Sequence, residues 1–377
     1  MVTMPNNGSK KVDHIFFYIP EIPEIETTGR YNQAIELPAH ATTSELITEQ
    51  PPPSAIQEQY DEVHILEGGD IARSRRARRL VDETFDREKS KQQLFVTTFH
   101  YAPALAGATS DAFWVVTRYD DPMQYAHNSP LSHHQVTARI LERLLRRADR
   151  QVYLVTPTRI PPQHTEIRFV RDGLGCPVEQ ITPGTKLTGE ALHAIWAGSP
   201  RIDRGMDILI DALTRVNAET VHVDVYGDAE TEVKRLAKRQ GVTDKLTFHG
   251  RQPHERVRTA IGDAEIGLCV LPERTDWLHT PSLKTREYLA GGTIPIVSDF
   301  PGFRSLARNH AIYSKPNGEA LSSVFQELEQ VSQTQLKTIF RQIREYASTI
   351  PMTKERQWWA QQIVGQTGIS LQATPTQ

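Results

Sequence analysis

The stretch from residue 280 to 287, T-P-S-L-K-T-R-E, carries residue types that bind phosphate and sugar hydroxyls. Its pattern predicts a loop followed by a helix over residues 283–289, which places Lys284 and Glu287 on one helix face. The first turn of a helix offers free backbone N–H groups and the positive end of the helix dipole. A cation beside a carboxylate could therefore hold a diphosphate and a ribose diol together.

Ser282 and Leu283 open this predicted helix, where their backbone amides could face a ligand. The pair Gly291 and Gly292 ends the helix, and an apolar run over residues 294–297 predicts a short buried strand. The residues that could bind the ligand therefore lie in a unit made of a loop, a helix and a strand.

The residue types over 281–302, P-S-L-K-T-R-E-Y-L-A-G-G-T-I-P-I-V-S-D-F-P-G, resemble the donor-binding segment of retaining glycosyltransferases of the GT4 family. The resemblance implies the GT-B fold, in which two Rossmann-like doubly wound α/β domains face a central cleft and a C-terminal helix crosses back to the first domain. It also implies that Glu287 binds the ribose of a nucleotide donor.

Residues 198–213, G-S-P-R-I-D-R-G-M-D-I-L-I-D-A-L, resemble a second pattern of that family, G-x(5)-K-G-x-D-x-L-I-x-A. Arg204 stands where the family has lysine, and it adds a planar donor fork that matches phosphate oxygens. We expect Arg204 and Lys284 to stabilise the departing diphosphate, with Arg201 assisting; surface ion pairs are the alternative for both arginines. Gly198 ends the preceding strand and is expected at the donor site.

Strands predicted over residues 222–226 and 245–249 end in Gly227 and Gly250, and Arg251 follows the second. The resemblance places Gly250 and its neighbours near the nucleotide base. We therefore count these three residues among the donor-binding residues.

The first half begins with an apolar strand predicted over residues 14–19, then a loop through Gly29 and Arg30 into a helix. Ligands of α/β proteins bind outside the carboxyl ends of parallel strands, so both residues are expected in a crevice; a plain connecting loop is the alternative. Strands alternating with helices predict a mostly parallel, doubly wound sheet. The further strands are predicted at residues 45–48, 62–66, 94–98, 113–117 and 151–156.

Two positions depart from the family pattern. The strand at 113–117 delivers Tyr119 and Asp120, where the family has His-Asp and the histidine approaches the transferred sugar. Tyrosine can donate a hydrogen bond but does not titrate near neutral pH. His279 occupies the place of the first of two glutamates, which touches the donor sugar in the family. Other histidines could fill the vacancy at Tyr119, or could be structural: His100, His127, His133 and His134.

The chain has 377 residues, which predicts two domains. We place an acceptor domain at 1–188 and a donor domain at 189–351. The tail at 352–377 is expected to pack back on the first domain through Trp358, Trp359 and Ile363.

Composition excludes several classes. A net charge of -3 argues against a dedicated nucleic-acid binder, and no apolar run approaches the length of a membrane-spanning helix. The start of the chain lacks the apolar core of a leader peptide. Cys176 and Cys269 are expected as reduced, buried thiols. These features predict a cytoplasmic protein.

Five arginines fall within residues 71–80, between Arg73 and Arg79, and residues 135–150 repeat this basic character. A basic helix face could contact an anionic membrane, which would place the protein peripherally at its inner face. A solvated face paired with nearby acids is the alternative.

Together these features predict a hexosyltransferase that moves sugar from a nucleoside-diphosphate sugar to a glycan, lipid-linked or other acceptor. Retention is implied by the resemblance alone. We expect no cofactor and no metal, because cationic side chains can stabilise the leaving diphosphate. The alternatives are a GT-B nucleotide-sugar epimerase or phosphorylase, or a donor-binding subunit that has lost catalysis.

Overall fold

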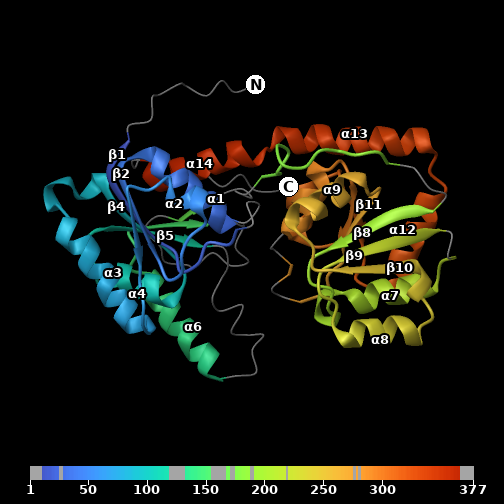
Figure 1. The fold of residues 1–377 in the computed structure, drawn as a ribbon, viewed down its shortest axis with the longest axis horizontal. Helices are drawn as coiled ribbons and strands as arrows, with labels where there is room; N and C mark the ends of the chain where they lie inside the picture. Colours follow the sequence, from blue (N-terminus) through green and yellow to red (C-terminus); the bar gives the residue numbers. More distant parts are fainter. Residues whose placement is uncertain are drawn as a thin grey trace. The chain divides into compact units, whose positions relative to one another are not determined.

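The computed structural model divides the chain into two compact units (Figure 1). Unit 1 contains Met1–Leu174 and Glu355–Gln377, and unit 2 contains Gly175–Lys354. The residues that the structure describes are 11–24, 29–118, 132–153, 167–169, 175–186, 191–217, 220–274, 277–278 and 282–365.

Unit 1 is built on a seven-stranded parallel sheet with the order β3-β2-β1-β4-β5-β6-β7. Strands β2 and β3 extend the sheet on one side of β1, and β4 to β7 extend it on the other side. The strands β1 and β4 therefore lie side by side at the switch point, where the direction of the strand order changes. The strands are β1 (Val12–Tyr18), β2 (Ala41–Thr48), β3 (Glu62–Ile65), β4 (Gln93–Thr98), β5 (Phe113–Arg118), β6 (Arg150–Tyr153) and β7 (Ile167–Phe169).

Helices cover both faces of this sheet, because alternate residues of the buried strand β1 point to opposite sides. Ile15 and Phe17 pack in one cluster with residues of α1, α2 and α14, whereas Phe16 and Tyr18 pack with residues of α3 and α4 (Figure 1). The helices are α1 (Gly29–Glu36), α2 (Ser54–Gln57), α3 (Asp70–Thr84), α4 (Tyr101–Thr109), α6 (Ser132–Leu145) and α14 (Met352–Val364).

The C-terminal helix α14 packs on unit 1, as predicted. Trp359 and Ile363 are buried in the cluster of β1, and Trp358 packs against that cluster while remaining partly exposed. Arg356 Nε donates to Glu36 Oε2 at 2.7 Å, and Arg150 Nη1 donates to the carbonyl of Ile363 at 2.9 Å. These polar contacts hold both ends of the helix.

Unit 2 repeats the plan with a six-stranded parallel sheet of order β10-β9-β8-β11-β12-β13. Its strands are β8 (Leu192–Ala197), β9 (Val221–Tyr226), β10 (Leu246–Gly250), β11 (Ile266–Cys269), β12 (Ile294–Ser298) and β13 (Ile312–Ser314). Its helices are α7 (Met206–Thr214), α8 (Thr231–Arg239), α9 (His254–Asp263), α10 (Leu283–Ala290), α11 (Pro301–Ala307), α12 (Gly318–Glu329) and α13 (Gln333–Thr349).

Both sheets follow the strand order of the dinucleotide-binding fold, in which the first strand is central and the order reverses beside it. The predicted pair of doubly wound Rossmann-like domains is therefore confirmed. In sheets of this order ligands bind at the carboxyl ends of the two switch-point strands, which are β1 and β4 in unit 1 and β8 and β11 in unit 2. A cleft between the domains stays a prediction.

Residues 175–186, which we expected in the first domain, cluster with unit 2. They belong to unit 2 because hydrogen bonds join them to it. Cys176 N donates to Ile350 O, and the Cys176 carbonyl accepts from Met352 N, both at 2.8 Å. Lys186 Nζ donates to the carbonyl of Gly262 at 2.6 Å. Both cysteines are buried and form no disulfide. No helix within the described ranges is long and apolar enough to cross a membrane.

Candidate active site

The turn between β8 and α7 packs directly on the chain that leaves β11. Gly205 precedes α7 with φ +93, and a Cβ added there would lie 1.9 Å from the carbonyl oxygen of Val270. Only glycine allows both this backbone conformation and this approach. The contact brings Arg204, the residue before it, to the carboxyl end of β11.

Arg204 is exposed, and its guanidinium carbon lies 4.7 Å from the ring centroid of Trp277. Cation–π stacking of this kind orients the planar fork while leaving its N–H groups free to meet a ligand. Arg201 has a different environment: its Nε lies 3.0 Å from Asp203 and 3.2 Å from Glu230. The structure thus gives Arg201 the surface ion pairs that were its alternative role.

Helix α10 forms as predicted and carries Lys284 and Glu287. Ser282 caps it by accepting a hydrogen bond from the backbone N of Lys284 at 3.2 Å. Lys284 Nζ lies 2.7 Å from Glu287 Oε2, and His254 Nε2 of α9 lies 3.3 Å from Glu287 Oε1. The Glu287 side chain is only 1% exposed. Leu283 is the first residue of the helix.

Glu287 is an ionised carboxylate in spite of its burial. Burial acts to raise its pKa, but the charge of Lys284 and the hydrogen bonds from His254 and Lys284 outweigh that effect and lower the pKa to about 2. A buried, charged oxygen acceptor beside a cation suits a sugar diol, whose two hydroxyls donate hydrogen bonds.

Cys269, at the end of β11, shows that the predicted residues converge. Burial raises the pKa of its thiol, whereas a hydrogen bond with Ser282 and the charges of Arg204 and Lys284 act to lower it. The charges of Arg204 and Lys284, from separate helical segments, therefore both act at the end of β11, a switch-point strand of unit 2. Arg204 and Lys284, with Glu287 paired to Lys284, thus lie around the carboxyl end of β11.

The ends of β8, β9 and β10 are drawn together by glycine contacts. Gly227 N donates to Gly250 O at 2.9 Å, and a Cβ on Gly227, whose φ is +135, would lie 2.2 Å from Gly198 O. Arg251 N donates to Asp228 Oδ1 at 3.1 Å. The three glycines thus form part of the same carboxyl edge as Arg204.

Unit 1 has its own polar group at its switch point. Arg30, near the start of α1, places Nη2 3.3 Å from His100 Nε2, and Thr98 Oγ1 at the end of β4 lies 2.9 Å from His100 Nδ1. Burial and the charge of Arg30 lower the pKa of His100 to about 4, so the imidazole is neutral. Because arginine can only donate, Nε2 accepts and Nδ1–H donates to Thr98. Gly29 is the first residue of α1.

Several predicted positions lie outside the described residues. They are Tyr119, Asp120, His127 and His279. Among the other histidines that could replace a family histidine, His100 lies at the carboxyl edge of the sheet, and His134 is an exposed residue of α6.

Comparison with known proteins agrees with this geometry. Residues 192–330 match the family glycosyl transferases group 1. The matched residues all lie within unit 2. No curated protein matches the chain in sequence.

Solved structures match most of the chain, including residues of both units. A glycosyltransferase from Rickettsia africae is 12% identical with a TM-score of 0.68, and the match covers 94% of this chain and 100% of that one. Sucrose-phosphate synthase from Thermosynechococcus elongatus is 14% identical, with a TM-score of 0.69 and coverage of 93% and 98%. Anabaena HepE in complex with UDP-glucose is 13% identical, with a TM-score of 0.69 and coverage of 93% and 99%. At these identities the likeness shows the GT-B fold.

The group 1 match spans the strands and helices that hold Arg204, His254, Lys284 and Glu287. Sequence reasoning missed His254, although it opens a helix after the strand end that carries Gly250. Its partner Glu287 is separated from it by 33 residues, and no local pattern indicates that contact.

Proposed function

We propose that the protein is a retaining, GT4-like glycosyltransferase of the hexosyltransferase class. It would move sugar from a nucleoside-diphosphate sugar to a glycan, lipid-linked or other acceptor. The observation that carries this proposal is the ionised, buried Glu287 held between Lys284 and His254.

In the proposed donor complex, Glu287 accepts hydrogen bonds from the ribose hydroxyls. Arg204, Lys284 and the positive end of the α10 helix dipole contact the diphosphate. As the bond from the sugar to the diphosphate breaks, negative charge grows on the leaving oxygen. Cations already in position stabilise that charge more than they stabilise the bound substrate, which is the condition for catalysis.

The acceptor side of the proposal rests on unit 1. Arg30 and the neutral His100 lie at the carboxyl ends of its switch-point strands, the usual ligand edge of such sheets. We include Tyr119 and Asp120, which follow β5 in sequence, as residues that approach the transferred sugar. Retention of configuration is part of the proposal through the family resemblance.

The base of the donor nucleotide is to be determined by comparing different nucleotide sugars. HepE is described in complex with UDP and with UDP-glucose. Uridine diphosphate sugars are therefore the first donors to test, followed by those of guanosine and adenosine.

We further propose that the protein is cytoplasmic and contacts the inner face of the membrane through α3 and α6. Exposed arginines of α3 are Arg75, Arg76, Arg78 and Arg79; those of α6 are Arg139 and Arg143, and the exposed Arg146 and Arg147 directly follow α6. Ile71 of α3 and Val136 and Ile140 of α6 are exposed apolar side chains that could enter the headgroup region. Arg73 differs, because it pairs with Glu49 and Asp70.

Cosedimentation with vesicles tests this contact. Binding to vesicles with anionic lipid, lost on reversing Arg75 and Arg79 to glutamate and retained in a Lys238→Glu control on α8, supports the proposal. Equal binding by all three proteins, or none, contradicts it and leaves the arginines as a solvated face.

The activity test is incubation of the purified protein with radiolabelled sugar nucleotides, with and without membrane lipid extract. Label transferred to an acceptor supports the proposed function. Donor binding without turnover favours the non-catalytic alternative. Release of labelled sugar phosphate that requires inorganic phosphate indicates a phosphorylase. Conversion of one sugar nucleotide into another without an acceptor indicates an epimerase.

A further inference from the structure

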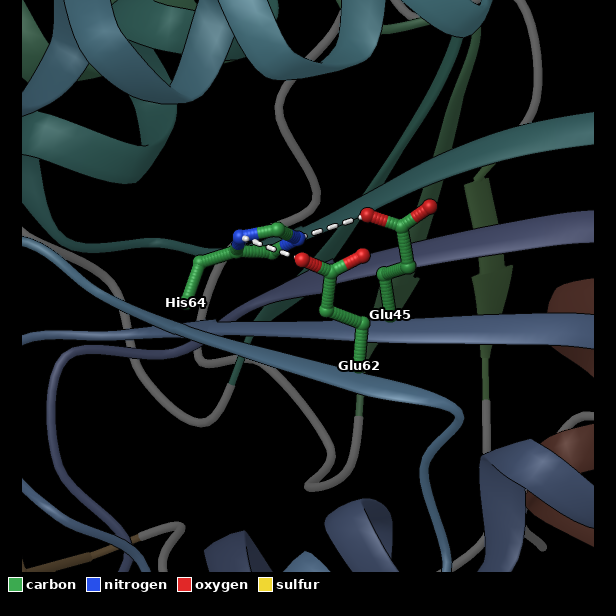
Figure 2. A group of neighbouring side chains, drawn as sticks. All are labelled: Glu45, Glu62 and His64. Carbon is green, nitrogen blue, oxygen red and sulfur yellow. Dashed lines mark hydrogen bonds and ion pairs between the residues drawn. The ribbon is translucent and has the colours of Figure 1, made fainter.

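Three strands at the edge of the unit 1 sheet gather carboxylates and imidazoles on one face. Figure 2 shows Glu45 of β2 with Glu62 and His64 of β3, their polar ends turned toward one another. His14 of β1 joins them, with Nε2 3.0 Å from Glu45 Oε1. Strand alternation explains the grouping: Phe16, Ile47 and Leu66, each two residues after a member of the group, are buried together in the cluster under α3 and α4.

The register sets two negative charges against each other. Glu45 and Glu62 are paired directly across β2 and β3. Like charges in this position destabilise a sheet. Within the described ranges, neither carboxylate has an ion pair with lysine or arginine; their ion-pair partners are His14 and His64. The pairing is therefore costly unless a positive charge accompanies it.

The donor atoms are those that divalent transition metals prefer. His64 Nε2 lies 2.7 Å from Glu45 Oε2, and its Nδ1 lies 3.8 Å from Glu62 Oε1. One ligand atom from each of Glu45, Glu62 and His64 falls within 4.8 Å of the other two. Atoms bound at about 2.1 Å to one zinc ion lie up to about 4.2 Å apart, so small side-chain rotations suffice.

Burial of the group is graded, as in a site with an open coordination position. The side chains of Glu45 and His64 are 13% and 16% exposed, whereas that of Glu62 is 65% exposed. His14 is buried and stacks on Phe16, with ring centroids 4.3 Å apart. It faces the carboxylate oxygen of Glu45 that His64 does not contact, the place of an outer residue that orients a metal ligand.

We propose that Glu45, Glu62 and His64 bind one divalent transition-metal ion, zinc or manganese, with His14 orienting Glu45. Imidazole suits zinc, and carboxylates suit both ions. The ion neutralises the facing carboxylates and joins the edge strand β3 to β2. None of these four residues belongs to the proposed donor or acceptor site, so the ion stabilises unit 1 and takes no part in sugar transfer.

The test is calorimetric titration of untagged, chelator-treated protein with zinc chloride and manganese chloride, with magnesium chloride for comparison. The expected result is one zinc or manganese ion per chain and a higher melting temperature. We expect Glu62→Gln and His64→Gln each to weaken binding at least about tenfold, and His14→Gln to weaken it about tenfold through orientation alone.

His222→Gln is the matched control, since His222 lies on a strand of unit 2 and contacts only a hydroxyl, Thr247 Oγ1 at 2.8 Å, in the hydrogen bonds of the described chain. Glu62 is exposed, so Glu62→Gln keeps the test valid even where His64→Gln fails to fold. Absence of binding by zinc and manganese overturns the proposal and leaves a histidine–carboxylate network. Binding that is unchanged in Glu62→Gln and His64→Gln also overturns it.

Discussion

Lys284 Nζ lies 2.7 Å from Glu287 Oε2 within one turn of α10, yet the lysine is 26% exposed and the glutamate 1%. The pair therefore presents the ammonium group of Lys284 to solvent, while the buried carboxylate of Glu287 also contacts His254 Nε2. An incoming nucleotide meets a charge pattern that is already in place, which reduces the ordering needed on binding.

Removing either charge of this pair should weaken nucleotide binding. Hydrogen bonds to charged groups contribute about 1.5–3 kcal/mol, so Lys284→Met and Glu287→Gln are each expected to raise the Kd of the nucleoside diphosphate about tenfold or more. Titration calorimetry measures the effect. Arg341 and Glu345 form an exposed pair on α13 and supply the controls Arg341→Met and Glu345→Gln. Equal losses in the controls would refute a specific role for Lys284 and Glu287.

His254 is expected to act on the donor through Glu287. His254→Ala should raise the nucleotide Kd severalfold, because one carboxylate oxygen loses its 3.3 Å partner. His254→Gln keeps an N–H donor at that end of the side chain and should restore part of the affinity. If alanine and glutamine behave alike, the hydrogen bond has no part in donor binding.

The stability that Glu287 contributes should depend on pH. Its pKa is about 2 in the folded protein and 4.5 ordinarily. The unfolded chain therefore binds the proton first as pH falls, so this contribution is complete above pH 4.5 and is lost toward pH 2. Urea unfolding of the wild type and of Glu287→Gln at several pH values measures it. The difference between the two proteins should shrink across this window; a constant difference would exclude an ionised Glu287.

The glycine contacts at the carboxyl edge of the unit 2 sheet predict that two glycine-to-alanine substitutions destabilise the protein to different extents. Gly241→Ala places a side chain in open space at φ +68, and should cost about 1–2 kcal/mol of unfolding free energy from backbone strain. Gly227→Ala adds a clash with Gly198 O at φ +135, which lies farther outside the region that L-residues adopt, so it should cost more and also weaken nucleotide binding. Comparable losses from both would mean that the contact between the strand ends is unimportant.

The acceptor side can be separated from the donor side at His100. His100→Ala should lower kcat while leaving the nucleotide Kd near the wild-type value, because His100 lies in unit 1 beside Arg30. His134→Ala, an exposed position on α6, is the control. A large change in nucleotide Kd for His100→Ala, with kcat preserved, would contradict this division.

The sequence predicted the fold closely, for physical reasons that particular elements illustrate. The apolar run at residues 14–19 corresponds to β1 (Val12–Tyr18), because a strand covered on both faces has no polar alternation. The helix predicted at 283–289 is α10 (Leu283–Ala290), whose serine cap is a local signal. Expected boundaries differ by a few residues, as helix and strand ends generally do.

Contacts made at long range were less accessible to sequence reasoning. The bond between His254 and Glu287, the stacking of Arg204 on Trp277, and the gathering of His14, Glu45 and His64 all join segments distant in sequence. Each depends on strand order and register, which periodicity does not specify. Ion pairs were an alternative for Arg201 and for the basic helix, but the sequence did not indicate the distant partners, Glu230 for Arg201 and Glu49 for Arg73.

The most direct test of the donor site is a thermal-shift panel of UDP, GDP, ADP and their sugars on the wild type and on Glu287→Ala. A ligand that binds only the folded protein raises its melting temperature. We predict that at least one nucleoside diphosphate or its sugar raises the melting temperature of the wild type and has little effect on Glu287→Ala. A panel without any shift, or one with equal shifts in both proteins, would contradict the account.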